Sequence, residues 1–210
     1  MFSLISKLNQ HLGYLAISVL ILSISVSSAK AIELKSIEDY LNSVHSLEAK
    51  FNQTNYDGSE SSGLIWLEKP GKLRLEYEQP SSLLVISSSG FTAVIDRLSN
   101  TLPQRYFTKN IPLNFLVEKN VNFLEEENSF ALSESEDTIK LKIFIDNSES
   151  KLIINFTTNP LTISGWTIQT ATGEIITLNL FDTKFNVEIT EDWIFGIGGE
   201  IQKHMGKISE

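Results

Sequence analysis

The chain has 210 residues, of which 41% are hydrophobic and 20% are charged, with a formal net charge of -9 at pH 7 and no cysteine. This length predicts one domain or at most two small ones, and the composition is that of a globular protein and excludes a disordered one. The acidic balance argues against DNA or RNA as the main partner, and the lack of cysteine excludes disulfides, thiolate metal sites, a cysteine nucleophile and anchoring through a lipidated N-terminal cysteine.

The first 31 residues have the pattern of a Sec-type signal peptide. Lys7 supplies a positive charge, residues 14–26 form an uncharged apolar run, and Ala-Lys-Ala at 29–31 fits the small-x-small cleavage rule. The apolar run is shorter than the ~20 residues of a membrane-spanning helix, which favours cleavage after Ala31 over the alternative, an uncleaved anchor. We therefore expect export to the periplasm and a single mature domain at 32–210.

Residues 36–48 are predicted to form one amphipathic helix. Ser36 is a suitable N-cap, because its hydroxyl can accept a hydrogen bond from the first turn. The apolar residues of one helix face follow the i, i+3, i+4, i+7 spacing: Ile37, Tyr40, Leu41 and Val44.

Nearly everything after this helix has the pattern of β-strands. Alternating apolar residues predict ten or eleven short strands between residues 47 and 185. Strands that follow one another at such short spacing form an antiparallel sheet. One short helix is expected within 111–120, where Pro112 suits a first helical position. The glycine-rich, polar stretch at 196–210 is expected to be a mobile tail.

The sequence carries no recognisable catalytic or cofactor-binding motif. It lacks H-E-x-x-H, G-x-S-x-G, the P-loop and the dinucleotide fingerprint. The two histidines beyond the signal peptide, His45 and His204, cannot form a metal site by spacing alone. We therefore expect no enzyme, no metal and no cofactor. A lipid hydrolase is disfavoured because no nucleophile and base are recognisable.

A single sheet with one or two helices cannot cover both of its faces, so it must close, pair with a second sheet or curl around something. Several strands are apolar on both faces; Leu64 and Trp66, for example, alternate with Ile65 and Leu67. Two interpretations remain open. One is an ordinary filled core with some partly exposed hydrophobic residues; the other is a concave sheet whose inner face is a pocket for an apolar ligand, covered by helices.

Three stretches carry a resemblance to a known family: Phe-Asn-Gln at 51–53, "GLIWLEKPGKLRLEYEQP" at 63–80, and "VISSSG" at 85–90. They resemble the periplasmic outer-membrane lipoprotein carrier family (LolA-like). Its members typically show F-x-Q, a strand ending in Arg or Lys before Pro, R-x-x-Y-x-x-P, and a strand ending in S-D-G. The chain departs from that pattern at Lys69, where Arg is common, and at Ser89, where Asp is common.

The resemblance implies an incomplete, unclosed antiparallel β-barrel of ten or eleven strands around a hydrophobic cavity, covered by a helical lid. It implies a monomeric carrier that takes acylated lipoproteins from a release transporter in the inner membrane and passes them to an outer-membrane acceptor or to the outer membrane itself. Such a carrier is needed because each acyl methylene left in water costs about 0.8 kcal/mol. The alternative on the same scaffold is a periplasmic module that senses lipids or lipoproteins.

The resemblance also assigns roles to residues. With Lys69 at the cavity edge, the expected lipid-cavity residues are Leu41, Val44, Phe51, Ile65, Leu67, Leu75 and Tyr77. The Lys69 ammonium would act as a lid latch by reaching the C-terminal carbonyls of the lid helix, where a cation is favoured. The alternative is a lysine that extends into solvent. Leu73, just after the turn, is expected to be exposed at the mouth and to dock on a partner; the alternative is a scattered surface leucine.

Overall fold

The structure is a computed structural model that describes residues 34–123, 130–135, 137–144 and 149–208. The predicted signal peptide lies outside these residues. The chain divides into two units, Met1–Ile37 and Glu38–Glu210, and the boundary falls within a helix at residues 34–43. The sheet and the elements that pack on it belong to the second unit.

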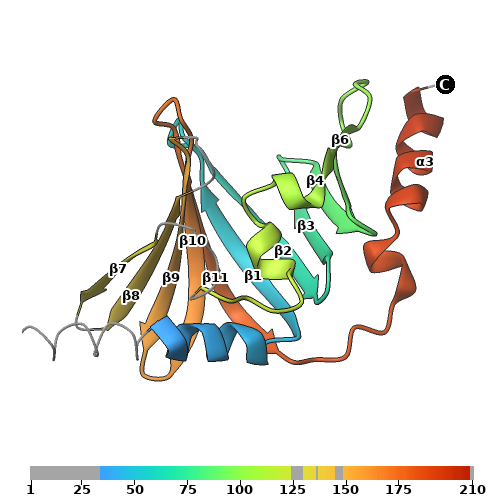
Figure 1. Ribbon diagram of the computed structural model, residues 1–210. Helices are drawn as coiled ribbons and strands as arrows, with labels where there is room; N and C mark the ends of the chain where they lie inside the picture. The colour runs from blue at the N-terminus through green and yellow to red at the C-terminus, as the bar shows by residue number, and fades with distance from the viewer. Residues whose placement is uncertain (1–33, 124–129, 136, 145–148, 209–210) are drawn as a thin grey trace, which may run out of the picture. The chain divides into compact units, whose positions relative to one another are not determined.

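Eleven antiparallel strands form a single sheet, in the order β6-β5-β4-β3-β2-β1-β11-β10-β9-β8-β7 (Figure 1). The strands are β1 (Ser46–Thr54), β2 (Glu60–Glu68), β3 (Lys72–Tyr77), β4 (Leu83–Ser88), β5 (Phe91–Asp96), β6 (Gln104–Phe107), β7 (Phe130–Ser135), β8 (Thr138–Phe144), β9 (Lys151–Thr158), β10 (Leu161–Gln169) and β11 (Ile175–Phe185). Because β6 and β7 end this order without pairing to each other, the sheet is not closed. The predicted incomplete antiparallel barrel is confirmed.

The first helix is shorter than the sequence predicted. It ends at residue 43 and not at 48, and β1 begins at Ser46. The short helix expected within 111–120 is present as α2 (Asn114–Val117), which follows the 3-10 turn η1 (Thr108–Asn110).

The C-terminal stretch was expected to be a mobile tail, and this expectation is wrong. The structure has a 3-10 turn η2 (Asp192–Phe195) and the helix α3 (Ile197–Ile208) here instead. One face of α3 follows helical spacing and meets the sheet: Ile197, Glu200, Ile201 and His204. The two isoleucines pack against a buried cluster from β4 and β5, comprising Leu84, Ile86, Ala93 and Ile95.

The strand register defines two faces of the sheet, and the buried apolar residues change face along it. Leu67 of β2 lies opposite Leu73 of β3 on the face that we call the inner face, and helix residues 38–43 and α2 cover it (Figure 1). On the outer face, Arg74 of β3 lies opposite Ile86 of β4, and α3 covers β4 and β5. The buried apolar side chains therefore lie on the inner face of the sheet in β1–β3 and on its outer face in β4–β5.

Candidate functional site

The inner face is closed by a lid, a name that we give to helix residues 38–43 together with α2. Ten side chains from the lid, from four strands (β1, β2, β10 and β11) and from the segments next to them enclose a space of only about 20 Å³. They are Leu41, Val44, Leu47, Ile65, Leu67, Lys69, Leu116, Ile163, Trp166 and Leu180. A space of this size holds no acyl chain, because the side chains of the lid and of the strands fill this part of the inner face.

The structure places the predicted cavity residues on or beside this face. Leu41, Val44, Ile65 and Leu67 line the small space, and Phe51 and Leu75 are buried in strands β1 and β3. Tyr77, at the end of β3, is partly buried and meets Phe51 edge to face, with 5.0 Å between ring centroids. Burial raises the pKa of Tyr77 to about 12, so its hydroxyl stays protonated and donates to Gln53 Oε1 over 2.7 Å.

Lys69 makes the contact with the lid helix that the resemblance implied. Its Nζ donates a 2.8 Å hydrogen bond to the carbonyl oxygen of Leu41, in the last turn of the helix at 34–43. The last carbonyls of a helix lack intrahelical partners and attract a cation. Burial lowers the pKa of Lys69, and the nearby Glu118 carboxylate partly offsets this effect. The side chain is therefore turned inward onto the lid and does not extend into solvent.

Two further contacts join the lid to the rest of the inner side. The backbone N–H of Gly71, in the turn after Lys69, donates to Val117 O of α2 over 2.7 Å. The Asn42 side chain forms two hydrogen bonds with the backbone of Val121, donating over 2.9 Å and accepting over 2.7 Å. The β2–β3 turn thus contacts both pieces of the lid.

Asn186, just after β11, fixes the chain where the lid helix ends. Its side chain donates to Ser43 O over 3.1 Å and accepts from His45 N over 2.8 Å. Sequence reasoning missed Asn42 and Asn186, because single asparagines in loops carry no periodic signal, and their partners lie about 80 to 140 residues away.

Leu73 does not lie exposed at the mouth, and this expectation is wrong. Its exposed fraction is 0%. The reason is that β3 is an interior strand, so Leu73 lies between Leu67 of β2 and Ser87 of β4 on the covered inner face. Its position after the turn suggested exposure, but strand pairing on both sides outweighs this local signal.

A partly buried ring of charges on the outer face positions α3. Arg74, 1% exposed, donates to Glu76 Oε2 over 2.7 Å and to Glu200 Oε1 over 3.2 Å. Arg97 donates to the other oxygens of the same two carboxylates, over 2.6 and 3.2 Å. Arg74 also donates to Ile194 O of η2 over 3.1 Å. Two cations and two anions thus neutralise one another and hold both η2 and α3 on the sheet.

The same ring changes the acidity of its carboxyl groups. Burial alone would raise the pKa of Glu76 and of Glu200. The hydrogen bonds and charges of Arg74 and Arg97 outweigh burial, so both pKa values lie below the ordinary value. Both carboxylates are therefore ionised at neutral pH.

The described part of the chain offers apolar surface and ion pairs. Among the residues that the structure describes, no group of three or more His, Asp or Glu side chains is placed to hold a metal ion. None of the described helices has the length and hydropathy that crossing a bilayer requires.

Comparison with known families gives this arrangement a context. Residues 42–195 match the family model described as "Outer membrane lipoprotein carrier protein LolA". The chain belongs to this family. The matched residues include the last part of the lid helix, α2 and all eleven strands, and end before α3.

Individual proteins resemble the chain over shorter stretches or at low identity. An uncharacterized protein of Rickettsia prowazekii is 25% identical over 137 residues, 65% of this chain and 64% of that protein. An outer-membrane lipoprotein carrier protein of Methylococcus capsulatus is 33% identical over 69 residues, 30% of this chain and 33% of that protein. The chain thus spans less than two thirds of either relative. A crystal structure of a LolA superfamily protein from Nitrosomonas europaea has a TM-score of 0.41 and 12% identity, and the match covers 77% of this chain and 96% of that one.

Proposed function

We propose that the protein is a periplasmic carrier that binds acyl chains of lipoproteins on its inner face and shuttles them from the inner to the outer membrane. One observation carries the proposal most directly: an apolar face is closed by a lid whose edges are joined to the sheet by a few polar contacts. Two of these, from Lys69 to Leu41 and from Gly71 to Val117, can break without unfolding the sheet.

Lid opening would expose the apolar inner face, and an acyl chain would then replace the lid side chains that fill it. Each methylene transferred from water contributes about 0.8 kcal/mol, which would offset the hydrogen bonds lost on opening, each worth ~0.5–1.5 kcal/mol net. Release follows the same path in reverse, because the closed lid fills the face again. A release transporter in the inner membrane and an acceptor at the outer membrane would supply and remove the cargo.

Photo-crosslinking from adjacent residues of one strand tests the proposal. A small diazirine amino acid at Ile65, on the inner face of β2, should capture an acylated lipoprotein when both proteins are produced in the periplasm. The same group at Leu64, which points to the outer face, should not. Capture is read as a band shift on a blot for the lipoprotein. In samples that are not irradiated, adding outer membranes should release the bound lipoprotein from the carrier, so that later irradiation captures less of it.

The matched pair also determines what would refute the proposal. Leu64 and Ile65 lie next to each other on β2, so both labels experience the same local concentration of any protein that contacts this strand non-specifically. Equal capture from the two positions, or capture that does not require the lipoprotein's acyl chains, would exclude the inner face as the cargo site.

A further inference from the structure

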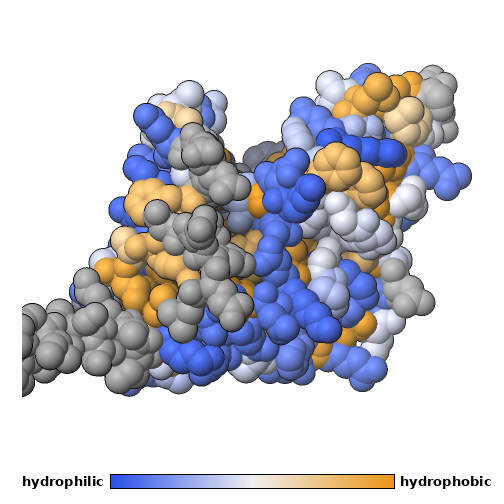
Figure 2. Space-filling model, viewed as in Figure 1, coloured by the Kyte–Doolittle hydropathy of each residue, from blue (hydrophilic) through white to orange (hydrophobic). Residues whose placement is uncertain are grey.

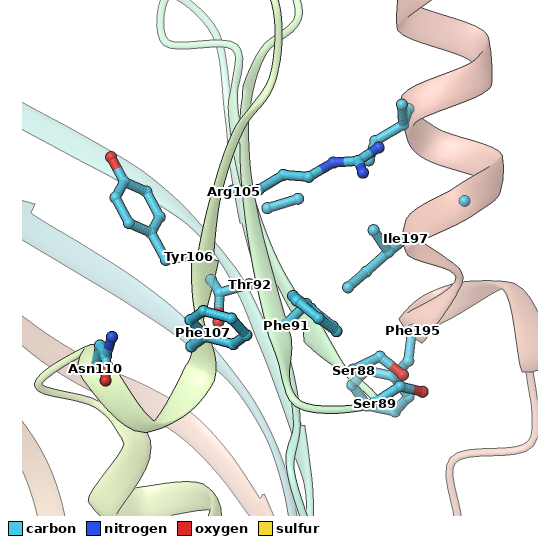
Figure 3. Close-up of a pocket in the computed structure, with 13 residues that line it drawn as sticks. Ser88, Ser89, Phe91, Thr92, Arg105, Tyr106, Phe107, Asn110, Phe195 and Ile197 are labelled. Carbon is cyan, nitrogen blue, oxygen red and sulfur yellow. The ribbon is translucent and has the colours of Figure 1, made fainter.

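A second cavity lies on the outer face, away from the lid. It is a groove of about 660 Å³ between β5, β6 and the beginning of α3 (Figure 3). Volumes of ~300–1,000 Å³ are typical of small-molecule sites. The small space under the lid holds only about 20 Å³ in the same structure, so the groove is much the larger of the two.

The walls of the groove are largely aromatic. Phe91 and Phe107 lie side by side on the outer face, 5.3 Å between ring centroids, and are 50% and 54% exposed. Phe195 of η2 and Ile197 of α3 form the opposite wall (Figure 3). Apolar side chains gather on the surface where β6 approaches α3 (Figure 2). Two neighbouring half-exposed phenylalanines leave apolar surface in water that a ligand would cover.

One cation at the groove lacks a partner. Arg105 lies opposite Ala93 on the outer face, and its side chain extends from β6 toward α3 (Figure 3). It makes no hydrogen bond or ion pair with any residue that the structure describes, whereas Arg74 and Arg97 each bind two carboxylates. The surrounding segment 91–110 holds three cations and one acid, a net charge of +2, in a chain of net charge -9. The groove therefore combines an apolar wall with an unpaired positive charge.

We infer that this groove binds a small amphiphile that has one acyl chain and an anionic head group, such as a long-chain fatty acid or a lysophospholipid. The planar guanidinium of Arg105 suits a carboxylate or phosphate, because its paired N–H groups match both geometrically. The acyl chain would lie along Phe91 and Ile197 toward Phe195. This site is separate from the proposed cargo site, since the two are on opposite faces of the sheet.

Photoaffinity labelling shows where on the chain the amphiphile binds, without choosing the groove in advance. A palmitate analogue with a diazirine near the chain end, used below its micellar concentration, should label peptides that contain residues 88–107 and 195–201. Labelling confined to peptides of the inner face, around Leu41 and Leu67, would overturn the inference but would leave the carrier proposal intact. Binding to vesicles of anionic phospholipid, without binding of the monomeric analogue, would assign the surface to a membrane and would also overturn it.

Two substitutions test the two halves of the groove. Arg105→Gln should weaken binding of palmitate and of lysophosphatidylglycerol about tenfold but leave palmitate methyl ester unaffected, because hydrogen bonds between two charged groups are stronger than those to a neutral ester. The ligand whose affinity decreases more shows whether Arg105 prefers a carboxylate or a phosphate head group. Equal losses for acid and ester, or none for either acid, would contradict a role for Arg105.

Gly198→Trp should abolish binding, because a side chain at Gly198 would enter the groove and its Cβ would meet no atom within 4 Å. Gly206→Trp is the matched control. It lies on the same helix, also has nothing within 4 Å of its Cβ, and does not line the groove. Unchanged melting temperatures for both variants would show that the fold is intact, and unimpaired binding by Gly198→Trp would refute the site.

Discussion

At the scale of single residues, a point charge contacts the lid. Lys69 offers a compact ammonium and holds one carbonyl, that of Leu41. An arginine at this position could reach several carbonyls at once, because its guanidinium presents donors in a planar fork. Lysine therefore makes the lid contact easier to break, which suits the repeated lid opening that the proposed carrier function requires.

Replacing Lys69 tests this contact. Lys69→Met should raise amide hydrogen exchange in residues 38–43 about tenfold, because a hydrogen bond from a charged donor contributes roughly 1–3 kcal/mol. Lys69→Arg should slow the same exchange. Lys72→Met is the control, since Lys72 pairs with Glu68 and makes no contact with the lid. Identical exchange in Lys69→Met and the native protein would show that the lid does not depend on this residue.

Leu73 gives a second residue-scale prediction. Because its side chain is fully buried, Leu73→Ala should lower the free energy of unfolding by about 2–5 kcal/mol, the usual loss for a leucine removed from a packed core. Leu98→Ala, at a position that is 70% exposed, should change it by less than about 0.5 kcal/mol. Urea denaturation of the two variants measures both values. Equally small losses for both variants would show that the Leu73 side chain is not part of the packed core.

At the scale of elements, α3 is attached by charge as well as by apolar packing. Its Glu200 shares two arginines with Glu76, and its isoleucines cover the apolar side of β4 and β5. The sequence did not indicate this helix as a packed one, because Glu200 and His204 lie on the same face as Ile197 and Ile201 and interrupt the apolar spacing. A charged residue on such a face normally indicates exposure, and here Arg74 of β3 and Arg97, just after β5, make the burial of Glu200 favourable.

The charge ring predicts how stability depends on pH. The pKa values of Glu76 and Glu200 lie below the ordinary 4.5, so the unfolded chain binds more protons than the folded one as the pH falls. The stabilisation is therefore fully present above pH about 4.5 and is lost as the pH falls through the lowered pKa values. The melting temperature should decrease steeply in this acidic range.

Glu200→Gln should flatten that decrease, because one of the two carboxyl groups no longer titrates. It should also lower the free energy of unfolding at pH 7 by about 2 kcal/mol, since Arg74 and Arg97 both lose an ionised partner. Thermal melts from pH 3 to 7 compare the two proteins. Parallel pH profiles would mean that Glu200 does not contribute to the acid sensitivity.

At the scale of the whole unit, carrying an acyl chain requires the lid to move while the sheet stays. Since the natural chain lacks cysteine, spin labels at Ser43→Cys, on the lid, and Thr172→Cys, between β10 and β11, would be unique. An acylated peptide should shift and broaden the distance distribution between them, and Lys69→Met should do so without ligand. A label pair within the sheet, such as Thr172→Cys with Glu60→Cys, should remain unchanged.

Most of the sheet could be predicted from the sequence, because alternation of apolar residues with a period of two is a local signal. The end of the first helix could not, since Val44 and Leu47 continue the helical spacing while Leu47 and Phe51 already follow the strand spacing. The inner-face position of Ile65 and Leu67 could be predicted, because every second residue of a strand shares a face and Lys69 was placed at the cavity edge. The change of apolar face at β4 could not be foreseen, because it depends on α3, which comes about 100 residues later.

The two unpaired sheet ends have a consequence for the protein in concentrated solution. Within the described residues, β6 and β7 each pair on one side only, and all four residues of β6 are exposed. Pairing of β6 from one copy with β7 of the next would leave a free strand at both ends, so the association would not close on itself. Mutual repulsion of chains with a net charge of -9 opposes this at neutral pH. Near the isoelectric point of about 4.9 that repulsion disappears, so we expect open-ended association through these strands to increase there.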